Sequence, residues 1–253
     1  MGNVEEKILI IDADAISYIC SKDTLEESIM RVDNILKSMF NYLKCNKYFM
    51  FLSFKPYFRN VIDPQYKAHR KPILSLIFLK EIKEYLIFKY NAQYRVPFEA
   101  DDLVAYAKRL YPYSIICSTD KDVLSTISGE WFNYKQFKRG YTTDEYALKF
   151  KYVQVLMGDV ADNIKGVPRI GISKATKIIE PLTFEPEMIE ACINQYNNYY
   201  KDDEIEALRL FNMNLQLVTL LVEDEDYIKY NKVVPNIGEP LIYNTVNNFS
   251  GYG

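Results

Sequence analysis

The chain has 253 residues, a formal net charge of −3 and an apolar content of 49%. This composition excludes a disordered chain, and the length suits one large α/β domain or one domain with a smaller helical region. No apolar run is long enough to span a membrane and no secretory signal is present, so we expect a cytoplasmic protein.

Histidine and cysteine are too sparse to support several common kinds of active site. The sequence contains one histidine, His69, and four cysteines. The cysteines are far apart and form no CxxC pair, which is typical of reduced, buried thiols. Zinc sites built from Cys and His, and Ser-His-Asp triads, are therefore disfavoured. We expect any hydrolytic nucleophile to be a water activated by a metal ion.

In the first half of the chain, short apolar runs alternate with helical patterns. Continuous apolar runs suit strands buried on both faces of a parallel sheet. Such runs predict strands at residues 7–11, 48–52, 93–96, 114–117 and 131–134. Helical periodicity predicts helices at 24–43, 73–90 and 101–110. The alternation predicts an α/β fold with a doubly wound, mostly parallel sheet, whose ligands bind beyond the carboxyl ends of the strands.

From about residue 142 onward, only helices are predicted. Their patterns fall at residues 143–150, 153–157, 173–179, 186–199 and 203–222. We therefore expect an α/β core at 1–141, a helical region at 142–243 and a mobile polar tail at 244–253.

Three acidic motifs occupy positions where folding alone gives no reason for them. They are Glu99-Ala100-Asp101-Asp102, Ser118-Thr119-Asp120-Lys121-Asp122 and Gly158-Asp159-Val160-Ala161-Asp162-Asn163. Gathered carboxylates repel one another, and hard divalent cations are the usual reason for gathering them. Asp12, Glu99 and Asp120 each follow a predicted strand, so we expect them to meet at one edge of the sheet. Helix capping is the alternative for Asp120 and Asp122, but it does not explain the first motif.

The third motif leads into a glycine-containing segment between two predicted helices. Its sequence is Gly166-Val167-Pro168-Arg169-Ile170-Gly171-Ile172-Ser173-Lys174-Ala175. Backbone N–H groups at the start of the second helix can bind a phosphate, and Arg169, Lys174 and Lys177 add positive charge. An ordinary helical hairpin is the alternative. Metal-binding carboxylates beside a phosphate-binding turn indicate a nuclease.

Five motifs in this order resemble those of the 5′-nucleases, which include flap endonucleases, bacteriophage 5′→3′ exonucleases and the N-terminal nuclease domain of bacterial DNA polymerase I. The motifs are Ile11-Asp12; Phe58-Arg59 with Tyr66-Lys67-Ala68-His69-Arg70; Glu99 to Asp102; Ser118 to Asp122; and Met157-Gly158-Asp159 through Lys174. The resemblance extends from Ile10 to about Val222 and is closest to a stand-alone phage-type enzyme. It implies a PIN-like fold, a helix-hairpin-helix (H3TH) motif at about 164–180, and a place in the cytoplasm of a bacterial or phage-infected cell.

The resemblance also implies two divalent ions, Mg²⁺ or Mn²⁺, that act together in phosphodiester hydrolysis. The first ion would be surrounded by Asp12, Glu99, Asp101, Asp102 and Asp120. The second would be surrounded by Asp120, Asp122, Asp159 and Asp162. A K⁺ ion at the helix-hairpin-helix turn is implied in the same way.

Lys67 and Arg70 match the basic pair that the family places near the scissile phosphate, and with Asp120 they are the predicted catalytic residues. Further nucleic-acid contacts are expected from basic, aromatic and turn residues. These are Arg59, Tyr66, Lys71, Gly166, Arg169, Gly171, Ser173, Lys174 and Lys177. Tyr66 is expected to stack on a base at the unpaired 5′ end. For residues 67–71, a solvated loop is the alternative.

Two features depart from the family. The aspartate expected at the end of the second strand is replaced by Leu52, and Asp14 is the candidate substitute. The stretch between Lys67 and Glu99 is also short, and residues 73–88 are apolar enough to belong to the core. We therefore expect a reduced arch, or an open gateway, in place of a long helical arch that threads a 5′ flap.

The expected function is a structure-specific 5′→3′ exonuclease or flap endonuclease. Its expected substrates are 5′ flaps, duplex ends and RNA:DNA hybrids, including RNA primers. We expect a monomer with replication proteins as candidate partners and no membrane partner. The first alternative is a catalytically weakened protein that binds DNA ends or junctions, which Leu52 favours. The second is a PIN-type ribonuclease, which the glycine-containing turn disfavours.

Overall fold

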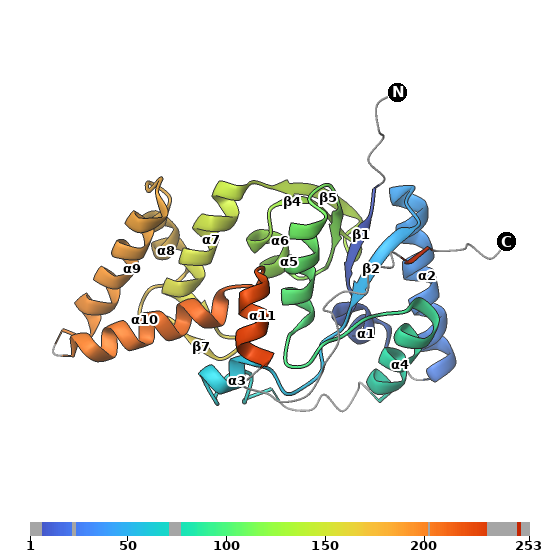
Figure 1. The fold of residues 1–253 in the computed structure, drawn as a ribbon, viewed down its shortest axis with the longest axis horizontal. Coiled ribbons are helices and arrows are strands. Elements are labelled where there is room, and N and C mark those ends of the chain that lie inside the picture. The colour runs from blue at the N-terminus through green and yellow to red at the C-terminus, as the bar shows by residue number, and fades with distance from the viewer. Residues whose placement is uncertain (1–6, 22–23, 71–76, 202, 232–246, 249–253) are drawn as a thin grey trace, which may run out of the picture. The chain divides into compact units, whose positions relative to one another are not determined.

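The computed structural model describes residues 7–21, 24–70, 77–201, 203–231 and 247–248. The chain divides into two compact units (Figure 1). The first, here called the sheet unit, comprises residues 1–57, 72–142 and 221–253. The second, the helical unit, comprises residues 58–71 and 143–220.

A six-stranded sheet forms the centre of the sheet unit, in the order β5-β4-β3-β1-β2-β8. The strands are β1 (Leu9–Asp12), β2 (Lys47–Phe51), β3 (Ile115–Cys117), β4 (Gly129–Asn133), β5 (Lys138–Thr142) and β8 (Asn247–Asn248). The four central strands, β2, β1, β3 and β4, pair in parallel. At the two edges of the sheet, β5 pairs antiparallel with β4 and β8 pairs antiparallel with β2. The predicted mostly parallel α/β sheet is confirmed.

Side chains on the central strand alternate between two buried faces. Leu9 and Ile11 pack in one core with side chains of α2 (Leu25–Leu43) and α4 (Leu79–Tyr90). Because successive side chains of a strand point to opposite faces, Ile10 faces the other side. That side carries α5 (Ala100–Leu110), and Figure 1 shows α5 across the sheet from α2 and α4. Burial on both faces explains the continuous apolar runs in the sequence.

Local sequence signals fix the ends of α2. The Thr24 hydroxyl accepts a hydrogen bond from the Glu27 N–H at 3.2 Å, which caps the start of the helix. Val32, Leu36 and Met39 then recur on one face and are fully buried. The helix ends at Lys44, which adopts a left-handed conformation with a φ of 51°.

The helix α4 is a core element, as the apolar sequence predicted. Its residues Ile82, Leu86 and Tyr90 are spaced by four and are buried. The observed helix begins at Leu79, whereas the predicted helix began at residue 73. Residues 71–76 lie outside the described part of the chain, so the region of the expected arch is described only from residue 77 onward. The remaining helices of this unit are α1 (Asp14–Cys20), α6 (Lys121–Thr126) and α11 (Asp224–Asn231).

The helical unit contains five helices within the described ranges and one short two-stranded ribbon. They are α3 (Arg59–Ile62), α7 (Asp144–Met157), β6 (Gly158–Asp159), β7 (Ile164–Lys165), α8 (Ile172–Ile179), α9 (Glu185–Tyr199) and α10 (Glu204–Val218). The two helices predicted at 143–150 and 153–157 are one continuous helix, α7. Its core side chains, such as Tyr152, pack with Cys192 and Tyr196 of α9.

Several expectations about elements were wrong, including that of helices alone beyond about residue 142, since β6, β7 and β8 lie there. The segment 93–96 is not a strand, because only Gln93 pairs, in a single parallel bridge with Phe51. Pro97 follows at once, and proline cannot donate to a sheet. The helix predicted to end at residue 222 ends at Val218. The antiparallel strand β5 was missed, because its residues Lys138 to Thr142 are largely polar.

The compact units also differ from the expected domain boundaries at two places. Residues 58–71 belong to the helical unit, where the Arg59 side chain bonds to backbone carbonyls of Leu217 and Thr219. Residues from 221 onward belong to the sheet unit, where Tyr227 is buried against Phe98. Within the expected tail, residues 247–248 form β8, and the rest lies outside the described residues.

We expect Gly158→Ala to destabilise the helical unit by about 2 kcal/mol. Gly158 has a φ of 71°, and an added Cβ would lie 2.3 Å from the Gly166 nitrogen and 2.3 Å from the Ile164 oxygen. Gly171→Ala is the matched control, since its Cβ would meet nothing within 4 Å, and we expect a loss below about 1 kcal/mol. Urea unfolding measures both, and equal losses would contradict this account.

Candidate active site

The carboxyl ends of β1 and β3 lie side by side and carry a chain of hydrogen bonds. Asp12 ends β1, and the Ser118 hydroxyl, just beyond β3, donates to its Oδ2 at 2.6 Å. The Ser118 Oγ in turn accepts from the Asp120 N–H at 3.0 Å. The expected meeting of Asp12 and Asp120 at one edge of the sheet therefore follows from the parallel pairing of β1 with β3. We call the carboxylates of this edge and its flanking helices the acidic rim. They are Asp12, Asp14, Glu99, Asp101, Asp102, Asp120 and Asp122.

Asp12 is a buried carboxyl group of the acidic rim with a raised pKa. Its side chain is buried, with 3% of its surface exposed. Burial, together with the charges of Asp14 and Asp120, raises the pKa of Asp12 to about 7, although the Ser118 hydrogen bond acts in the opposite direction. Burial and neighbouring carboxylates disfavour the charged form of Asp12, and a bound cation would stabilise it.

The start of α5 holds the acidic motif at 99–102. Glu99 and Asp102 are buried, and the Glu99 N–H donates to Asp102 Oδ2 at 3.2 Å. Asp102 Oδ1 accepts from the Leu221 N–H at 3.2 Å, and the Tyr227 hydroxyl donates to the Asp102 backbone oxygen at 2.9 Å. The Glu99 side chain in turn accepts from the Asp102 backbone N–H, so these two residues form a capping box. The expectation that capping does not explain the first motif was therefore wrong for Glu99 and Asp102. Both carboxylate oxygens of Asp102 accept hydrogen bonds from backbone N–H groups, which gives this residue a structural role. Its predicted role as a metal ligand stays a prediction.

Asp120 caps the short helix α6. Its Oδ1 accepts from the Asp122 N–H at 2.7 Å, as the capping alternative for this residue requires. Asp120 is nevertheless exposed at the end of the sheet, and the cap involves only its Oδ1. Capping and metal binding are therefore compatible for Asp120.

The donor chemistry of the acidic rim fits a hard divalent cation, although no complete cage is formed. Among the described residues, no three His, Cys, Asp or Glu side chains are arranged to hold a metal ion. Mg²⁺ keeps several of its waters and is usually bound through one or two carboxylates, so it does not need a dedicated cage of protein ligands. The burial of Asp12 beside the charges of Asp14 and Asp120 is the observation that favours a cation here.

Asp14 reaches the end of β2, where the resemblance led us to expect an acidic residue and the sequence has Leu52. Its Oδ1 accepts from the Ser53 N–H at 3.1 Å. The same oxygen accepts from the Lys83 ammonium at 2.8 Å, and this ammonium also donates to the Ser53 backbone oxygen at 2.8 Å. Asp14 thus lies where the missing carboxylate was expected, but it is already paired with a cation.

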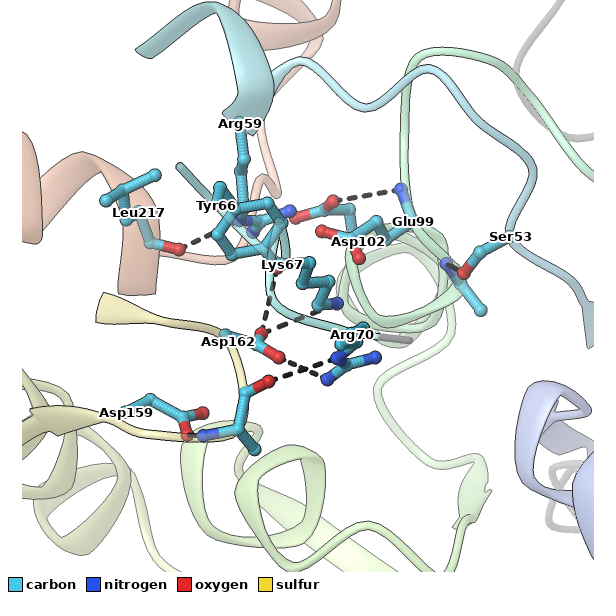
Figure 2. A network of polar contacts seen from close by, with 12 residues as sticks. Ser53, Arg59, Tyr66, Lys67, Arg70, Glu99, Asp102, Asp159, Asp162 and Leu217 are labelled. Carbon is cyan, nitrogen blue, oxygen red and sulfur yellow. Dashed lines mark hydrogen bonds and ion pairs between the residues drawn. The ribbon is translucent and has the colours of Figure 1, made fainter. Parts of the chain in front are cut away.

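In the helical unit, the predicted basic pair is organised around Asp162 (Figure 2). Arg70 Nη2 forms an ion pair with Asp162 Oδ1, and Arg70 Nε donates to the Ala161 backbone oxygen at 3.0 Å. Lys67 Nζ lies 3.4 Å from Asp162 Oδ2, and the Tyr66 hydroxyl donates to the same oxygen at 2.9 Å. Asp162 therefore orients both cations and offsets part of their charge. The alternative of an unstructured solvated loop does not fit this network.

The structure gives Arg59 and Tyr66 roles other than the predicted ones. Arg59 is 3% exposed, and its guanidinium donates to the backbone oxygens of Leu217 at 2.8 Å and Thr219 at 3.1 Å. It thereby satisfies carbonyls at the end of α10, a common role for arginine at a helix C-terminus. Tyr66 is also 3% exposed, so its ring is covered and is not available to stack on a base.

The predicted phosphate-binding turn connects α7 to α8. Close approach of Gly158 and Gly166 shapes this turn, so Gly166 is needed for backbone packing. Arg169 is exposed and has a φ of 66°. An open depression at the start of α8 is lined by Gly171, Ile172, Ser173, Lys174 and Lys177. The structure thus brings the predicted residues of α8 together on one surface. Asp159 accepts from the Ala161 N–H at 2.7 Å within the turn, and Lys71 lies outside the described residues.

Three residues that organise the acidic rim carry no clear signal in the sequence. Ser118 belongs to a quoted motif, but it was given no role of its own. Ser53 accepts from the Ala100 N–H at 2.7 Å, and Lys83 holds Asp14. Neither residue belongs to a recognisable motif, and Lys83 is simply one of several lysines on an amphipathic helix.

We expect Arg59→Met to lower the free energy of unfolding by about 2 kcal/mol, because it leaves buried carbonyls without a donor. Arg70→Met is the matched control. Its side chain is 48% exposed, so we expect a loss below about 1 kcal/mol. Urea denaturation of both variants measures the difference, and a negligible effect at Arg59 would refute its structural role.

Sequence comparison finds curated relatives that are nucleases. A 5'-3' exonuclease of Buchnera aphidicola (subspecies Acyrthosiphon pisum) is 29% identical over 201 residues, which cover 74% of this chain and 67% of that protein. The flap endonuclease Xni of Shewanella halifaxensis is 28% identical over 166 residues, covering 60% of this chain and 63% of that protein. No protein-family model matches the chain.

Solved structures show the same fold at lower identity. The flap endonuclease of bacteriophage T5, in a complex with DNA and metal ions, aligns with a TM-score of 0.67 at 19% identity and covers 90% of this chain and 97% of that chain. The catalytic core of Rad2, in complex with DNA substrate, aligns with a TM-score of 0.52 at 14% identity and covers 97% of this chain and 83% of that chain. The resemblance of this chain to the 5′-nucleases is thus confirmed in both sequence and fold.

Proposed function

We propose that this protein is a divalent-metal-dependent, structure-specific 5′-nuclease that hydrolyses phosphodiester bonds near the 5′ ends of branched or duplex DNA. The observation that carries the proposal is the buried Asp12 at the end of β1, joined through Ser118 to Asp120. The names of the relatives, 5'-3' exonuclease and flap endonuclease, support the same activity.

The acidic rim would hold the divalent ions, Mg²⁺ or Mn²⁺. For the first ion we propose Asp12, Glu99, Asp101 and Asp120 as ligands, with Asp102 holding the start of α5 in place. For the second ion, the ligand set that the resemblance implies, Asp120, Asp122, Asp159 and Asp162, stays a prediction. When bound, such ions polarise the phosphoryl oxygens and lower the pKa of a water nucleophile.

Lys67 and Arg70 would stabilise the charge that develops on the phosphoryl oxygens. Their ion pairs with Asp162 fix both side chains before substrate arrives, so less conformational freedom is lost when they meet a phosphate. Asp162 would therefore have two roles: it positions these two cations, and it is a predicted metal ligand.

The exposed start of α8 would bind the duplex backbone away from the cut. Ser173, Lys174 and Lys177 share one open depression with the backbone of Gly171, and such contacts read phosphate and not base sequence. A K⁺ ion at this turn is proposed by resemblance.

For substrate and context, we propose DNA with 5′ flaps or duplex ends, with RNA:DNA hybrid primers as a second substrate. The protein would act as a monomer in the cytoplasm of a bacterial or phage-infected cell, beside replication proteins. None of the helices in the described ranges has the length and apolar character needed to cross a bilayer. A DNA-end-binding protein without catalysis stays the alternative, because Leu52 removes one carboxylate and Lys83 neutralises its substitute.

Cleavage of a 5′-labelled flap duplex tests the proposal. With Mg²⁺, and separately with Mn²⁺, we expect release of the labelled 5′ fragment that EDTA abolishes. Asp120→Ala should lower the rate by at least about a hundredfold, because it removes a carboxylate shared by both proposed ions. Binding of the flap without cutting in either metal would favour the DNA-end-binding alternative.

The position of α4 in the core gives a second test. Its buried residues leave few residues for an arch, so we expect the enzyme to cut flaps with free and with blocked 5′ ends at comparable rates. A bulky complex on the 5′ end of the labelled flap provides the block. Complete inhibition by that block would contradict the expectation of an open gateway.

A further inference from the structure

We propose that Lys83 is a built-in counterion of the acidic rim, which withholds Asp14 from the divalent metal and sets the rim's metal affinity below what its carboxylates alone would give. This inference rests on the proposed function, since it concerns the metal site of the same nuclease. It assigns a role to a residue on α4 that no motif marks.

The Lys83 ammonium is held by groups from two other segments. Its Nζ lies 2.8 Å from Asp14 Oδ1 and 2.8 Å from the Ser53 backbone oxygen. It also lies 4.9 Å from the centre of the Phe54 ring, on the ring face. The Lys83 side chain is 12% exposed and the Asp14 side chain 25%, so solvent screens the pair only partly. The ammonium is therefore a fixed charge.

This fixed charge acts on the acidic rim through Asp14. The Asp14 N–H donates to Asp12 Oδ1 at 3.1 Å, so Asp14 lies beside Asp12 at the end of β1. Asp14 also accepts from the Ser53 N–H, and the Ser53 hydroxyl accepts from the Ala100 N–H at the start of α5. One cluster thus joins the ends of β1 and β2 to the helix that carries Glu99 and Asp101.

This arrangement should lower the affinity of the acidic rim for a divalent cation. Metal affinity in carboxylate sites follows the number of charges available to the ion. Asp14 would add one negative charge beside Asp12, but the Lys83 ammonium cancels it. The pair therefore contributes no net charge, and the rim binds its metal with fewer effective carboxylates than its sequence suggests.

A double-mutant cycle on the whole chain tests the proposal. Binding of Mn²⁺ alone is measured by electron paramagnetic resonance. Lys83→Met leaves the Asp14 charge uncancelled, and we expect Mn²⁺ affinity to rise about tenfold. Asp14→Asn leaves the Lys83 charge uncancelled, and we expect affinity to fall about tenfold. The double variant removes both charges, and its affinity should return to within about threefold of the wild type.

The control is Lys89→Met on the same helix, where Lys89 pairs with Asp33, and it should leave Mn²⁺ affinity unchanged. General damage to the fold would weaken binding in every rim variant, so a rise on losing a lysine distinguishes a counterion from a purely structural residue. Unchanged or weaker binding in Lys83→Met, with the protein folded by circular dichroism, would overturn the proposal. If Lys83→Met fails to fold, the comparison of Asp14→Asn with the double variant tests the proposal instead. A double variant that binds Mn²⁺ no more tightly than Asp14→Asn would overturn the proposal.

The cycle also separates this inference from the proposed function. If the wild-type protein binds Mn²⁺ and cuts flap DNA, but Lys83→Met shows no gain in Mn²⁺ affinity, only the counterion role is overturned. A gain of Mn²⁺ affinity in Lys83→Met, with no cleavage by any variant, would support the counterion role and count against the nuclease. Absence of Mn²⁺ binding in both proteins would overturn both.

Discussion

The parallel pairing of β1 with its two neighbours is the constraint on which the rest of the sheet unit depends. Leu9 to Asp12 pairs on one side with β2 and on the other with β3, so three strand ends come to one edge. Because side chains on both faces are buried, the register leaves Asp12 at the last position of a fully buried strand. A carboxylate at that place needs compensation, and the neighbouring residues are arranged around this need.

Charge compensation takes a similar form in the two units. In the sheet unit, Lys83 holds Asp14 and thereby joins the ends of β1 and β2. In the helical unit, Asp162 holds Lys67 and Arg70. In both places the charged groups are fixed by ion pairs within one unit before any ligand binds. Such preorganisation is what electrostatic catalysis requires, because groups that are already oriented need no rearrangement as charge develops.

Sequence patterns were sufficient where one physical requirement determined the residue type. Continuous apolar runs gave β1, β2 and β3, and their parallel order gave the meeting of Asp12 with Asp120. Patterns failed where long-range contacts decided. Arg59 looked like a DNA contact by its place in a motif, but it is buried beneath the end of α10, 158 residues away from its partner Leu217. Likewise, the pattern gave no sign that Asp102 accepts a hydrogen bond from the backbone N–H of Leu221, 119 residues away. Local sequence carries no information about such partners.

A metal-soaked crystal structure tests the central claim most directly, namely that the sheet edge at Asp12 and Asp120 is a divalent-cation site. Anomalous diffraction from a Mn²⁺-soaked crystal locates the ion independently of any activity. We expect a peak beside the Asp12 and Asp120 carboxylates, with Asp14 still bonded to Lys83. A Mn²⁺ peak elsewhere in the protein, with none at this edge under conditions that support flap cleavage, would contradict the account.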